Sequence, residues 1–566
     1  MIVGIDLGTT NSAVAFWRDG EAHLIPNSIG DVLTPSAVGL SDDGALLVGM
    51  AARERQSTHP KLTATAFKRL MGTQKPIQLG RTRYSAEDLS ALVLRGLKAD
   101  AEAFLGAPVD GAVITVPAYF NDRQRKATRR AGELAGLRVE RLVNEPTAAA
   151  LAHGIHERED KQPFLVFDLG GGTFDVSIVE IFDGIIEVRA SAGDNRLGGE
   201  DFNEILVEAA RSRLGRKDEF AVGSELREIM RAAAERTRRA LTDADRAPYR
   251  FVWKGEAHEI EIAAAEFEEA AAPLLARLRD PVLRSLRDSN IHTDQLSEII
   301  LVGGATRMPV VRRAVTRMFG RFPGGAVHPD HAVALGAAVQ AGLKARDAAL
   351  DEIRLTDVCP FTLGVDTAER DPSGGIRRGV FAPIIERNTV IPASRVHSFS
   401  TLFDNQREVR FGVYQGESRQ VAANVKLGEI GLQVPPRPAG QVRIDVRFSY
   451  DASGLLEVDV TVPETGAARQ LVICDDSDAP SEDEVAKRRE ALAALKVHPR
   501  EEAANAAALA RAERCYEGFL AERRDFVGQL ILAFEAVLER QDPREIATAR
   551  AELEGQLDGL EGERYL

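Results

Sequence analysis

Two stretches of the chain share one pattern of apolar and polar positions. Residues 2–16, IVGIDLGTTNSAVAF, form an apolar run, then Asp6, then a short Gly and Thr turn, then a second apolar run. Residues 164–180, FLVFDLGGGTFDVSIVE, repeat this order with Asp168 before a glycine-rich turn. Each stretch is typical of two strands joined by a turn. Because the second lies about 160 residues after the first, the pattern predicts a duplicated unit whose two half-domains face each other across a cleft.

The glycine-rich turn of the second stretch is suited to binding phosphate. Gly170, Gly171 and Gly172 have no Cβ atom and can take positive φ, so their backbone N–H groups can approach a phosphate closely. Asp168 is placed to hold a hydrated Mg2+, which proteins usually bind through one or two carboxylates. Glycine-rich hairpins also occur in ordinary sheets, but the second copy weakens that interpretation. Together the two turns predict a nucleotide triphosphate in the cleft.

Residues 1 to about 350 alternate strand-like and helix-like segments, which predicts an α/β architecture. Strands are expected over 112–116 and 299–302, and helices over 122–135 and 226–241. No GxxxxGK[ST] sequence occurs, which argues against a P-loop nucleotide fold. Phosphate binding is therefore assigned to the two hairpin turns.

A different pattern begins near Cys359, where short alternating strands with Gly and Pro punctuation replace the α/β alternation. Residues 442–449 and 456–462 alternate apolar and polar side chains on either side of a turn at 451–454. This is the pattern of a hairpin of half-buried strands. The region up to about residue 475 is therefore predicted to be an antiparallel β-sandwich.

The last 85 or so residues are rich in Ala, Leu, Glu and Arg and show no strand signal. Residues 481–484, Ser-Glu-Asp-Glu, fit a capping box, and residues 542–545, Asp-Pro-Arg-Glu, fit a helix start with Pro in the first turn. We expect a helical bundle here.

Charge and cysteine usage narrow the functional class. A net charge of −14 argues against general nucleic-acid binding, which depends on Lys and Arg. Cys359, Cys474 and Cys515 lack CxxC spacing, so free thiols are expected rather than a zinc site or disulfides. The sequence has neither a signal-peptide pattern at its start nor an apolar run approaching membrane-spanning length. We expect a cytoplasmic protein without a membrane partner.

Five motifs in one order carry a resemblance to a known family. They are GIDLGTTNS (4–12), VPAYFNDRQRKAT (116–128), NEPTAAALA (144–152), DLGGGTFDVS (168–177) and LVGGATRMP (301–309). Together they resemble the DnaK-type heat-shock chaperone family, which lies within the superfamily of actin and the sugar kinases. The resemblance continues into the C-terminal half and so covers nearly the whole chain.

The resemblance implies the fold and the domains. Residues 1–350 are expected to form an actin-like two-lobed ATPase domain, followed by a linker over 351–358. Residues 359–475 would be the antiparallel β-sandwich peptide-binding domain, and 476–566 the α-helical lid. The implied function is an ATP-dependent chaperone, in which ATP hydrolysis gates affinity for extended apolar segments of unfolded or client proteins.

The family's catalytic positions transfer to this chain one by one. Lys68, in TAFKRLMG, matches the catalytic lysine, and Glu145, Asp175 and Thr173 complete the catalytic set. Asp6 and Asp168 would hold Mg2+, with K+ beside it as in the family. The implied chemistry is in-line attack of water on the γ-phosphate of ATP, with Lys68 stabilising the transferring phosphoryl group.

The resemblance also implies the residues that contact the nucleotide. They are Gly8, Thr9, Thr10, Asn11, Gly170, Gly171, Gly172, Glu235, Arg238, Thr242, Gly303, Gly304, Arg307 and Asp330. Arg238 and Thr242 replace the Lys and Ser usual in the family; because Arg can stack on a purine, adenine binding should survive with altered affinity. His328 and His331 also depart from the family, and we interpret them as structural rather than as metal ligands.

The resemblance also implies a set of residues that carry communication between the two halves. Pro117 and Arg125 match the segment that relays nucleotide state, whereas Arg141, Asn144 and Asp357 match docking positions for a J-domain co-chaperone. Surface charge alone explains these residues equally well. In the linker, Arg354 and Thr356 replace apolar residues, and each large apolar group removed loses about 1.5–3 kcal/mol of burial. Weaker coupling between the halves is therefore expected.

Seven apolar residues match the family's peptide cleft. The lining would consist of Leu363, Val365, Phe399, Val409 and Phe411, with Leu402 and Ala368 arching over the peptide. Without the resemblance, these residues are simply core. Asp404 and Arg437 are expected to latch the helical lid.

The spacing between Lys68 and Pro117 is shorter than is usual in the family, so recognition by a GrpE-type exchange factor is left open. The chain most resembles the short, specialised bacterial branch typified by HscC. Three rivals remain: a small-molecule kinase, an actin-like filament protein, and a nucleotide-gated binder of one dedicated client with weak coupling. The first two leave the β-region and helices without a task.

Overall fold

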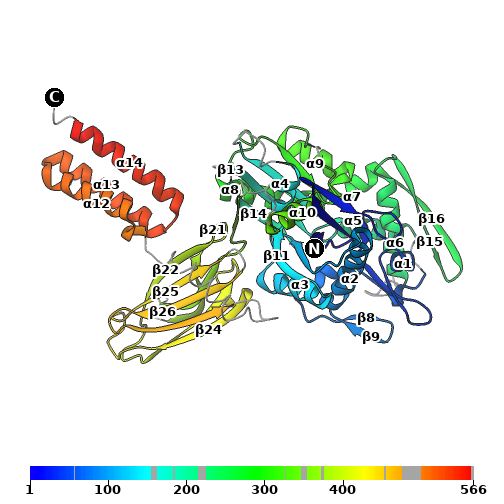
Figure 1. Ribbon diagram of the computed structural model, residues 1–566, viewed down its shortest axis with the longest axis horizontal. Coiled ribbons are helices and arrows are strands. Elements are labelled where there is room, and N and C mark those ends of the chain that lie inside the picture. Colours follow the sequence, from blue (N-terminus) through cyan, green and yellow to red (C-terminus); the bar gives the residue numbers. More distant parts are fainter. Residues whose placement is uncertain are drawn as a thin grey trace. The chain divides into compact units, whose positions relative to one another are not determined.

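The computed structural model describes residues 1–56, 58–154, 162–182, 185–214, 225–324, 327–345, 354–370, 375–451, 454–473 and 499–562 (Figure 1). It divides into two compact units. The first runs from Met1 to Phe361, and the second begins at Thr362.

The first unit contains two large sheets of similar topology. In one sheet the strand order is β11-β10-β1-β2-β3, with β1 parallel to β10 and antiparallel to β2. Its strands are β1 (Ile2–Asp6), β2 (Asn11–Arg18), β3 (Glu21–Ile25), β10 (Gly111–Val116) and β11 (Arg138–Asn144).

In the other sheet the first unit's strands follow the order β17-β12-β13-β14-β18, with β12 parallel to β17 and antiparallel to β13. They are β12 (Phe164–Leu169), β13 (Phe174–Phe182), β14 (Ile185–Asp194), β17 (Ile299–Val302) and β18 (Arg354–Val358). The two predicted hairpins therefore occupy equivalent places in two similar sheets, which confirms the duplication expected from the sequence.

Two helices made of small residues lie against these sheets and each other. They are α4 (Glu145–Ala152) and α10 (Ala332–Lys344), and α10 packs on α4, β1 and β2. A Cβ atom on Gly336 would lie 1.7 Å from the Ala148 carbonyl oxygen, and one on Gly4 would lie 2.2 Å from the Ala338 nitrogen. Glycine is therefore required where the helices and the sheet approach most closely.

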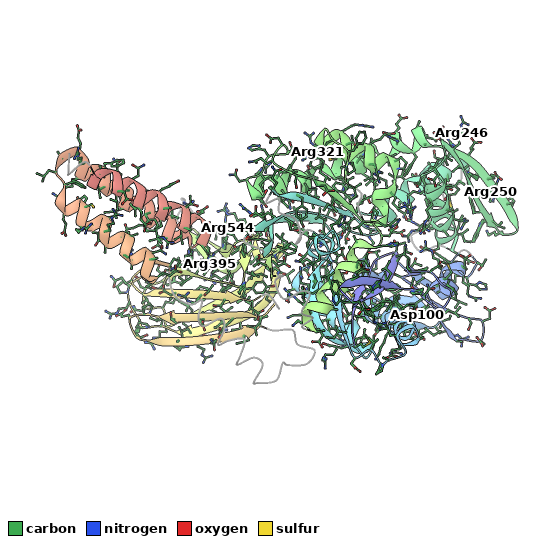
Figure 2. All side chains as sticks on the ribbon, turned by 45° about the horizontal axis from the view of Figure 1, so that its top comes forward. Asp100, Arg246, Arg250, Arg321, Arg395 and Arg544 are labelled. Atoms are coloured by element: carbon green, nitrogen blue, oxygen red, sulfur yellow. The ribbon has the colours of Figure 1, made fainter. Side chains whose placement is uncertain are left out.

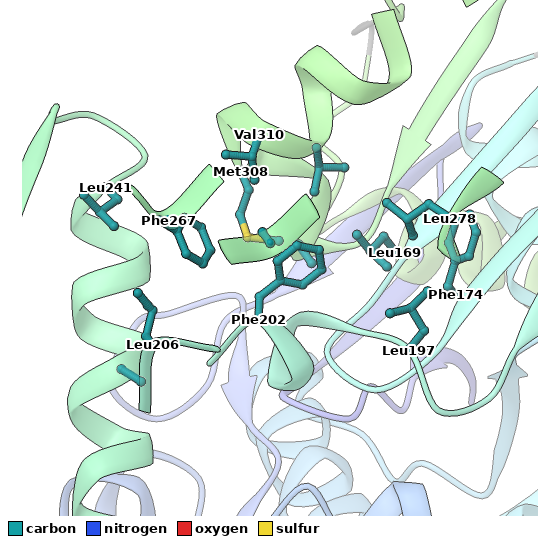
Figure 3. Close-up of a cluster of buried hydrophobic side chains, with 14 of the residues drawn as sticks. Leu169, Phe174, Leu197, Phe202, Leu206, Leu241, Phe267, Leu278, Met308 and Val310 are labelled. Carbon is teal, nitrogen blue, oxygen red and sulfur yellow. The ribbon is translucent and has the colours of Figure 1, made fainter. Parts of the chain in front are cut away.

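A large apolar core covers one side of the second sheet (Figure 3). Phe174 of β13 and Leu169 of β12 belong to the same cluster as Phe202 and Leu206 of α5, together with Met308. The helices around this core are α5 (Gly199–Leu214), α6 (Glu225–Ala240), α7 (Ala264–Arg277), α8 (Arg279–Ser289) and α9 (Pro309–Phe319). This core fixes the position of the glycine-rich turn that follows Leu169.

The four elements predicted for this region are confirmed. Strands β10 and β17 and helix α6 match the expected ranges closely, and the helix expected over 122–135 is α3 (Asp122–Leu134). Asn121 and Gln124 form the capping box of α3. The remaining elements are β4 (Thr34–Pro35), β5 (Ala37–Leu40), β6 (Leu46–Val48), β7 (Thr63–Thr65), β8 (Ile77–Leu79), β9 (Thr82–Tyr84), β15 (Arg246–Trp253), β16 (Glu256–Ala263), α1 (Met50–Glu54), α2 (Ala86–Leu105), and short 3-10 turns at Pro60–Leu62, Phe67–Leu70 and Gly304–Arg307.

The second unit contains two four-stranded antiparallel sheets, β20-β19-β23-β24 and β22-β25-β26-β27. Their strands are β19 (Leu363–Arg370), β20 (Ile376–Ile385), β22 (Ala393–Ser400), β23 (Glu408–Gln415), β24 (Val425–Gln433), β25 (Arg443–Tyr450), β26 (Leu456–Val462) and β27 (Ala467–Ile473), and a short strand β21 (Val390–Ile391) precedes β22. The sheets contact each other through β24 with β27 and β20 with β22. The predicted hairpin is β25 and β26, and Ile444, Val446 and Phe448 are fully buried, as the alternation requires.

Among the described residues 499–562, the second unit continues with α12 (Ala503–Gly518), α13 (Ala521–Arg540) and α14 (Pro543–Gly562). Phe534, Leu538 and Leu557 form part of their shared core. Asp542 Oδ1 accepts hydrogen bonds from the backbone N–H groups of Arg544 at 2.9 Å and Glu545 at 3.2 Å, which confirms the predicted helix start. The capping box expected at 481–484 lies outside the described residues. Across the part of the chain that the structure describes, no helix is long and apolar enough to span a membrane.

Candidate functional site

The two predicted phosphate turns meet each other in the first unit. A Cβ atom on Gly171 would lie 2.0 Å from Thr10 Oγ1, and one on Gly172 would lie 2.9 Å from Thr9 Oγ1. The sequence analysis gave two reasons for these glycines, positive φ and the missing Cβ atom; none of Gly170, Gly171 and Gly172 has positive φ, so only the second reason applies. Close approach of the two turns is the reason that glycine is needed.

A buried ion pair lies beside these turns. Lys68 Nζ donates a hydrogen bond to Glu145 Oε1 at 3.1 Å, and both side chains are less than a tenth exposed. Lys68 comes from the 3-10 turn Phe67–Leu70, and Glu145 is the first residue of α4. The ammonium also lies 5.5 Å from the centre of the Phe120 ring. A cation is thus held in a water-poor environment, where its interaction with an added anion is strong.

Three aspartates lie around this pair: Asp168 and Asp175 are buried, and Asp6 is half-buried. Burial, followed by the charge of Glu145, raises the pKa of Asp6 to about 7 and that of Asp175 to about 8. The pKa of Asp168 is raised well above its usual range by burial and by the charges of Glu145, Asp175 and Asp6. Crowded carboxylates with raised pKa values are typical of sites that bind cations or move protons.

The acidic cluster fits a divalent cation bound together with phosphate. Oδ2 of Asp168 is buried and, among the described residues, has no hydrogen-bond partner, while Asp6 Oδ1 accepts a hydrogen bond from Thr115 at 3.1 Å. The described residues contain no group of three or more His, Cys, Asp or Glu that could hold a metal by itself. This suits Mg2+, which usually keeps several waters and binds through one or two carboxylates plus substrate phosphates.

A cavity of about 370 Å³ opens over this cluster. Most of the predicted residues line it: Asp6, Gly8, Thr9, Thr10, Asn11, Lys68, Glu145, Asp168, Gly170, Gly171, Thr173, Arg238, Thr242, Gly303, Gly304, Arg307 and Asp330. Asp175, Gly172 and Glu235 do not line it. Gly172 belongs to the glycine-rich turn and faces Thr9, and Asp175 packs closely on β14, where a Cβ atom on Gly193 would lie 2.1 Å from Asp175 Oδ1.

Glu235 is placed differently from the prediction. Its carboxylate pairs with Arg53 of α1 and, at 2.7 Å, with Arg239 one turn further along α6. The sequence could not show this arrangement, because Arg53 is distant in the chain. Arg239, which the sequence reasoning missed, lines the cavity instead.

Arg238 and Asp330, which were both predicted to contact the nucleotide, also line the cavity. Arg238 Nε donates to Asn203 Oδ1 at 2.8 Å, and burial lowers the pKa of the guanidinium to about 10. Arg307 pairs with Asp330 at 3.3 Å. His328 Nδ1 accepts a hydrogen bond from the Asp330 backbone N–H at 3.3 Å, which agrees with a structural role for this histidine.

Other lining residues were missed by the sequence reasoning. They are Leu33, Gly199, Asp243, Val302, Ala305, Met308, Pro329 and Val333. Gly199 had a signal, because Gly198 and Gly199 precede an acidic helix start. The backbone N–H of Gly199 donates to the Gly170 carbonyl at 2.9 Å, which places the start of α5 against the glycine-rich turn.

A comparison with protein-family models agrees with this geometry. The family described as Hsp70 protein matches residues 2–563, nearly the whole chain. The chain belongs to the Hsp70 family. Membership supports a general chaperone role, ATPase activity with ATP and Mg2+, and binding of client polypeptides and J-domain co-chaperones as general properties of Hsp70 proteins.

In this Hsp70 family member, hydrogen bonds join Arg125, predicted for the relay, to Asn144 and Asp357, which were predicted for J-domain docking. Arg125 donates to the Ala118 carbonyl at 3.2 Å and to Asn144 Oδ1 at 2.7 Å, and Asn144 Nδ2 donates to Asp357 Oδ2 at 2.5 Å. Asp357 lies on β18, which pairs in parallel with β14. Pro117 directly follows β10 and is buried, and Arg141 is half-buried on β11.

The residues predicted for the Hsp70 peptide cleft come from two strands of one sheet and one strand of the other. Leu363 and Val365 lie on β19, Phe399 lies on β22, and Val409 and Phe411 lie on β23. The rings of the two phenylalanines are 5.4 Å apart, and all of these residues except Phe399 are buried. The two arch residues Leu402 and Ala368 are half-buried.

The structure gives each of the two predicted latch residues a partner. Asp404 Oδ1 accepts a hydrogen bond from the Ala439 backbone N–H at 2.8 Å, and Arg437 pairs with Glu464. Both partners lie in loops of the two sheets rather than on the helices, because these loops approach one another closely. Because residues 474–498 lie outside the described residues, contact of Asp404 and Arg437 with the lid stays a prediction.

Proposed function

We propose that the chain is an ATP-driven chaperone, in which ATP hydrolysis in the first unit sets the affinity of the second unit for extended apolar peptide segments. The observation that supports this most directly is the buried Lys68–Glu145 pair. This pair lies among aspartates whose pKa values are raised, at the place where the two turns that contain glycine and threonine meet.

In the proposed reaction, water attacks the γ-phosphorus, the bond to the bridging oxygen breaks, and ADP leaves. Mg2+ supplies positive charge next to the phosphates when bound, and Asp6 and Asp168 are the residues that would hold it, with K+ beside it. Lys68 stabilises negative charge on the transferring phosphoryl group. The proton of the water passes to the acidic cluster, in which Glu145 lines the cavity and Asp175 does not.

For the second unit, we propose that its two sheets form the peptide-binding sandwich and its helices the lid. Leu363, Val365, Phe399, Val409 and Phe411 would line the cleft. The bulky Phe411 against Phe399 favours smaller apolar side chains in the peptide. We also propose the domain limits 1–350, 351–358, 359–475 and 476–566, a cytoplasmic location, and a place in the short bacterial branch typified by HscC.

The chain of hydrogen bonds from Arg125 through Asn144 to Asp357 supports the proposed coupling of the two halves. It begins at the loop whose Ala118 and Tyr119 backbone N–H groups act on the Asp175 carboxylate and lower its pKa in part. A J-domain co-chaperone docking at Arg141, Asn144 and Asp357 would act on the same series of hydrogen bonds.

Peptide affinity in the two nucleotide states tests this function. A fluorescent apolar peptide should bind more tightly with ADP than with ATP, as measured by anisotropy. Phe399→Ala should weaken binding in both states, while Phe403→Ala, a neighbouring side chain that is 42% exposed, should not. Equal affinity with ATP and ADP in the unaltered chain would contradict the proposal.

A further inference from the structure

Strand β22 lies at the edge of its sheet and is partly covered by a residue from the helices. In the sheet β22-β25-β26-β27, β22 pairs with β25 along one side. On its other side, the Val396 carbonyl accepts a hydrogen bond from Gln541 Nε2 at 3.0 Å, and the Val396 N–H donates to Gln541 Oε1 at 3.4 Å. Gln541 therefore contributes a donor and an acceptor to the same backbone residue.

Gln541 is held firmly in this position. It occupies the left-handed region, with φ of 56°, at the turn between α13 and α14, and it is only 5% exposed. One donor and one acceptor bound to a single edge residue is what a residue of an added β-strand provides. The Gln541 amide thus imitates a peptide group in the place of a fifth strand.

The register shows which other backbone groups face outward. Because the N–H and C=O of Val396 point away from β25, the alternation of a strand directs those of Ser394 and Ser398 the same way. Those of Arg395 and His397 point toward β25. The outer edge therefore presents Ser394, Val396, Ser398 and, at the end of the strand, Ser400, and Gln541 covers Val396.

Arg395 adds to this cover. Its Nη1 donates to the Ser394 carbonyl at 3.0 Å. Burial lowers the pKa of Arg395, and the charge of Asp542, next to Gln541, acts in the opposite direction. Arg395 is labelled on its strand in Figure 2. Edge strands that are not protected readily pair with other chains, and here side chains protect Ser394 and Val396.

We propose that the outer edge of β22 is a second polypeptide-binding surface, which takes up an extended chain by β-strand addition after the Gln541 turn has left it. The occupant is an extended polypeptide because the resident group imitates a peptide amide. Recognition through backbone groups is tolerant of sequence. This surface uses outward backbone groups of β22, whereas the apolar cleft uses the Phe399 side chain of the same strand, and binding at the edge does not require ATP hydrolysis.

Amide-resolved hydrogen exchange on the full chain tests this with Gln541→Gly. Glycine adopts positive φ without strain, so only the side-chain amide is lost. The Val396 amide should exchange about fivefold faster, as expected for one lost hydrogen bond. A peptide of alternating valine and threonine should then slow exchange at Ser394, Val396 and Ser398 but not at Arg395 or His397. Gln529→Ala, an exposed position on α13, is the matched control and should behave like the unaltered chain.

A second pair of variants separates the edge from the cleft. Ser398→Pro, combined with Gln541→Gly, removes an outward N–H and leaves the ladder to β25 intact, so peptide should no longer protect Ser394 and Val396. Ser398→Ala in the same background should keep that protection. Protection that is absent in Gln541→Gly, or that persists in the double variant carrying Ser398→Pro, would overturn the proposal. Protection at alternate amides of β22 would uphold the edge surface even if the peptide bound with the same affinity in ATP and ADP. The equal affinity would then contradict only the proposed chaperone cycle.

Discussion

At the scale of single residues, the site depends on opposite charges held where water is scarce. The Lys68 ammonium and the Glu145 carboxylate are buried together, and the nearby aspartates are pushed toward their neutral forms. An environment of this kind strengthens the interaction of Lys68 with phosphate and makes the carboxylates sensitive to a bound cation.

Lys68→Ala should lower single-turnover ATP hydrolysis by about 10²–10³-fold, because one preorganised charge is lost from the transition state. ATP binding should change little in a nucleotide titration, since the two turns remain. Lys75→Ala, an exposed lysine in the loop after Lys68, is the control and should leave both values unchanged. Parallel loss of binding and hydrolysis in Lys68→Ala would show that Lys68 is needed to bind ATP rather than to hydrolyse it.

The raised pKa values of Asp6, to about 7, and Asp175, to about 8, predict a pH dependence of stability. Between the unfolded pKa near 4 and these folded values, the folded protein holds protons that the unfolded chain releases. Without ligand, these two groups therefore lower the free energy of unfolding progressively as pH rises from about 4 to about 8.

Because Mg2+ favours the ionised carboxylates, thermal stabilisation by Mg-ADP should be larger at pH 8 than at pH 6. Thermal unfolding with and without Mg-ADP at both pH values measures this. Asp175→Asn should reduce the pH dependence seen without ligand. A stabilisation that is the same at both pH values would argue against cation binding by this cluster.

At the scale of elements, the hairpins and helices could be predicted because their signals are local. The β25–β26 alternation and the Asp542 helix start were both readable from neighbouring residues. The pairing of Glu235 with Arg53 could not be read from neighbouring residues, because Arg53 lies in another part of the chain. The reason for the glycine-rich turn was also hidden, because it depends on the approach of a second turn.

The turn itself offers a matched pair of substitutions. Gly171→Ala would place a Cβ atom 2.0 Å from Thr10 Oγ1, whereas the nearest atom to one on Gly170 is 3.7 Å away. We expect Gly171→Ala to weaken ATP binding about tenfold or more through displacement of the turns. Gly170→Ala should have a much smaller effect. Nucleotide titration, with thermal unfolding to check folding, distinguishes them, and equal effects would contradict the close packing of the turns.

The pairing of the linker strand β18 changes the expectation that apolar side chains alone hold the linker. Apolar side chains missing at Arg354 and Thr356 were expected to weaken docking, yet β18 pairs with β14 through its backbone at Arg354, Leu355 and Thr356. Backbone pairing does not depend on those side chains, so side-chain burial is only one contribution to linker docking. Asp357, bonded to Asn144, then becomes the side chain most open to a test.

Asp357→Ala should remove that hydrogen bond, speed exchange of the β18 amides about fivefold, and reduce any effect of peptide on ATP hydrolysis. Asp357→Asn keeps an acceptor for Asn144 and should retain most of both. Hydrogen exchange and single-turnover assays measure the two effects. Unchanged exchange in Asp357→Ala would show that the pair does not hold the linker strand.

At the scale of the whole molecule, five motifs were enough to indicate the family, and the match over residues 2–563 agrees. The two similar sheets of the first unit and the two antiparallel sheets of the second follow from the repeated hairpins and the later change of periodicity. The sequence did not reveal the Gln541 contact with β22, because a turn between helices has no local signal for the strand it meets.

Single-turnover ATP hydrolysis on the full chain, with and without an extended apolar peptide, tests the central claim most directly. Coupling of the two units predicts faster hydrolysis with peptide in the unaltered chain, and loss of that acceleration in Phe399→Ala but not in Phe403→Ala. A peptide that binds at the cleft without changing the hydrolysis rate would contradict the claim that ATP turnover gates peptide binding.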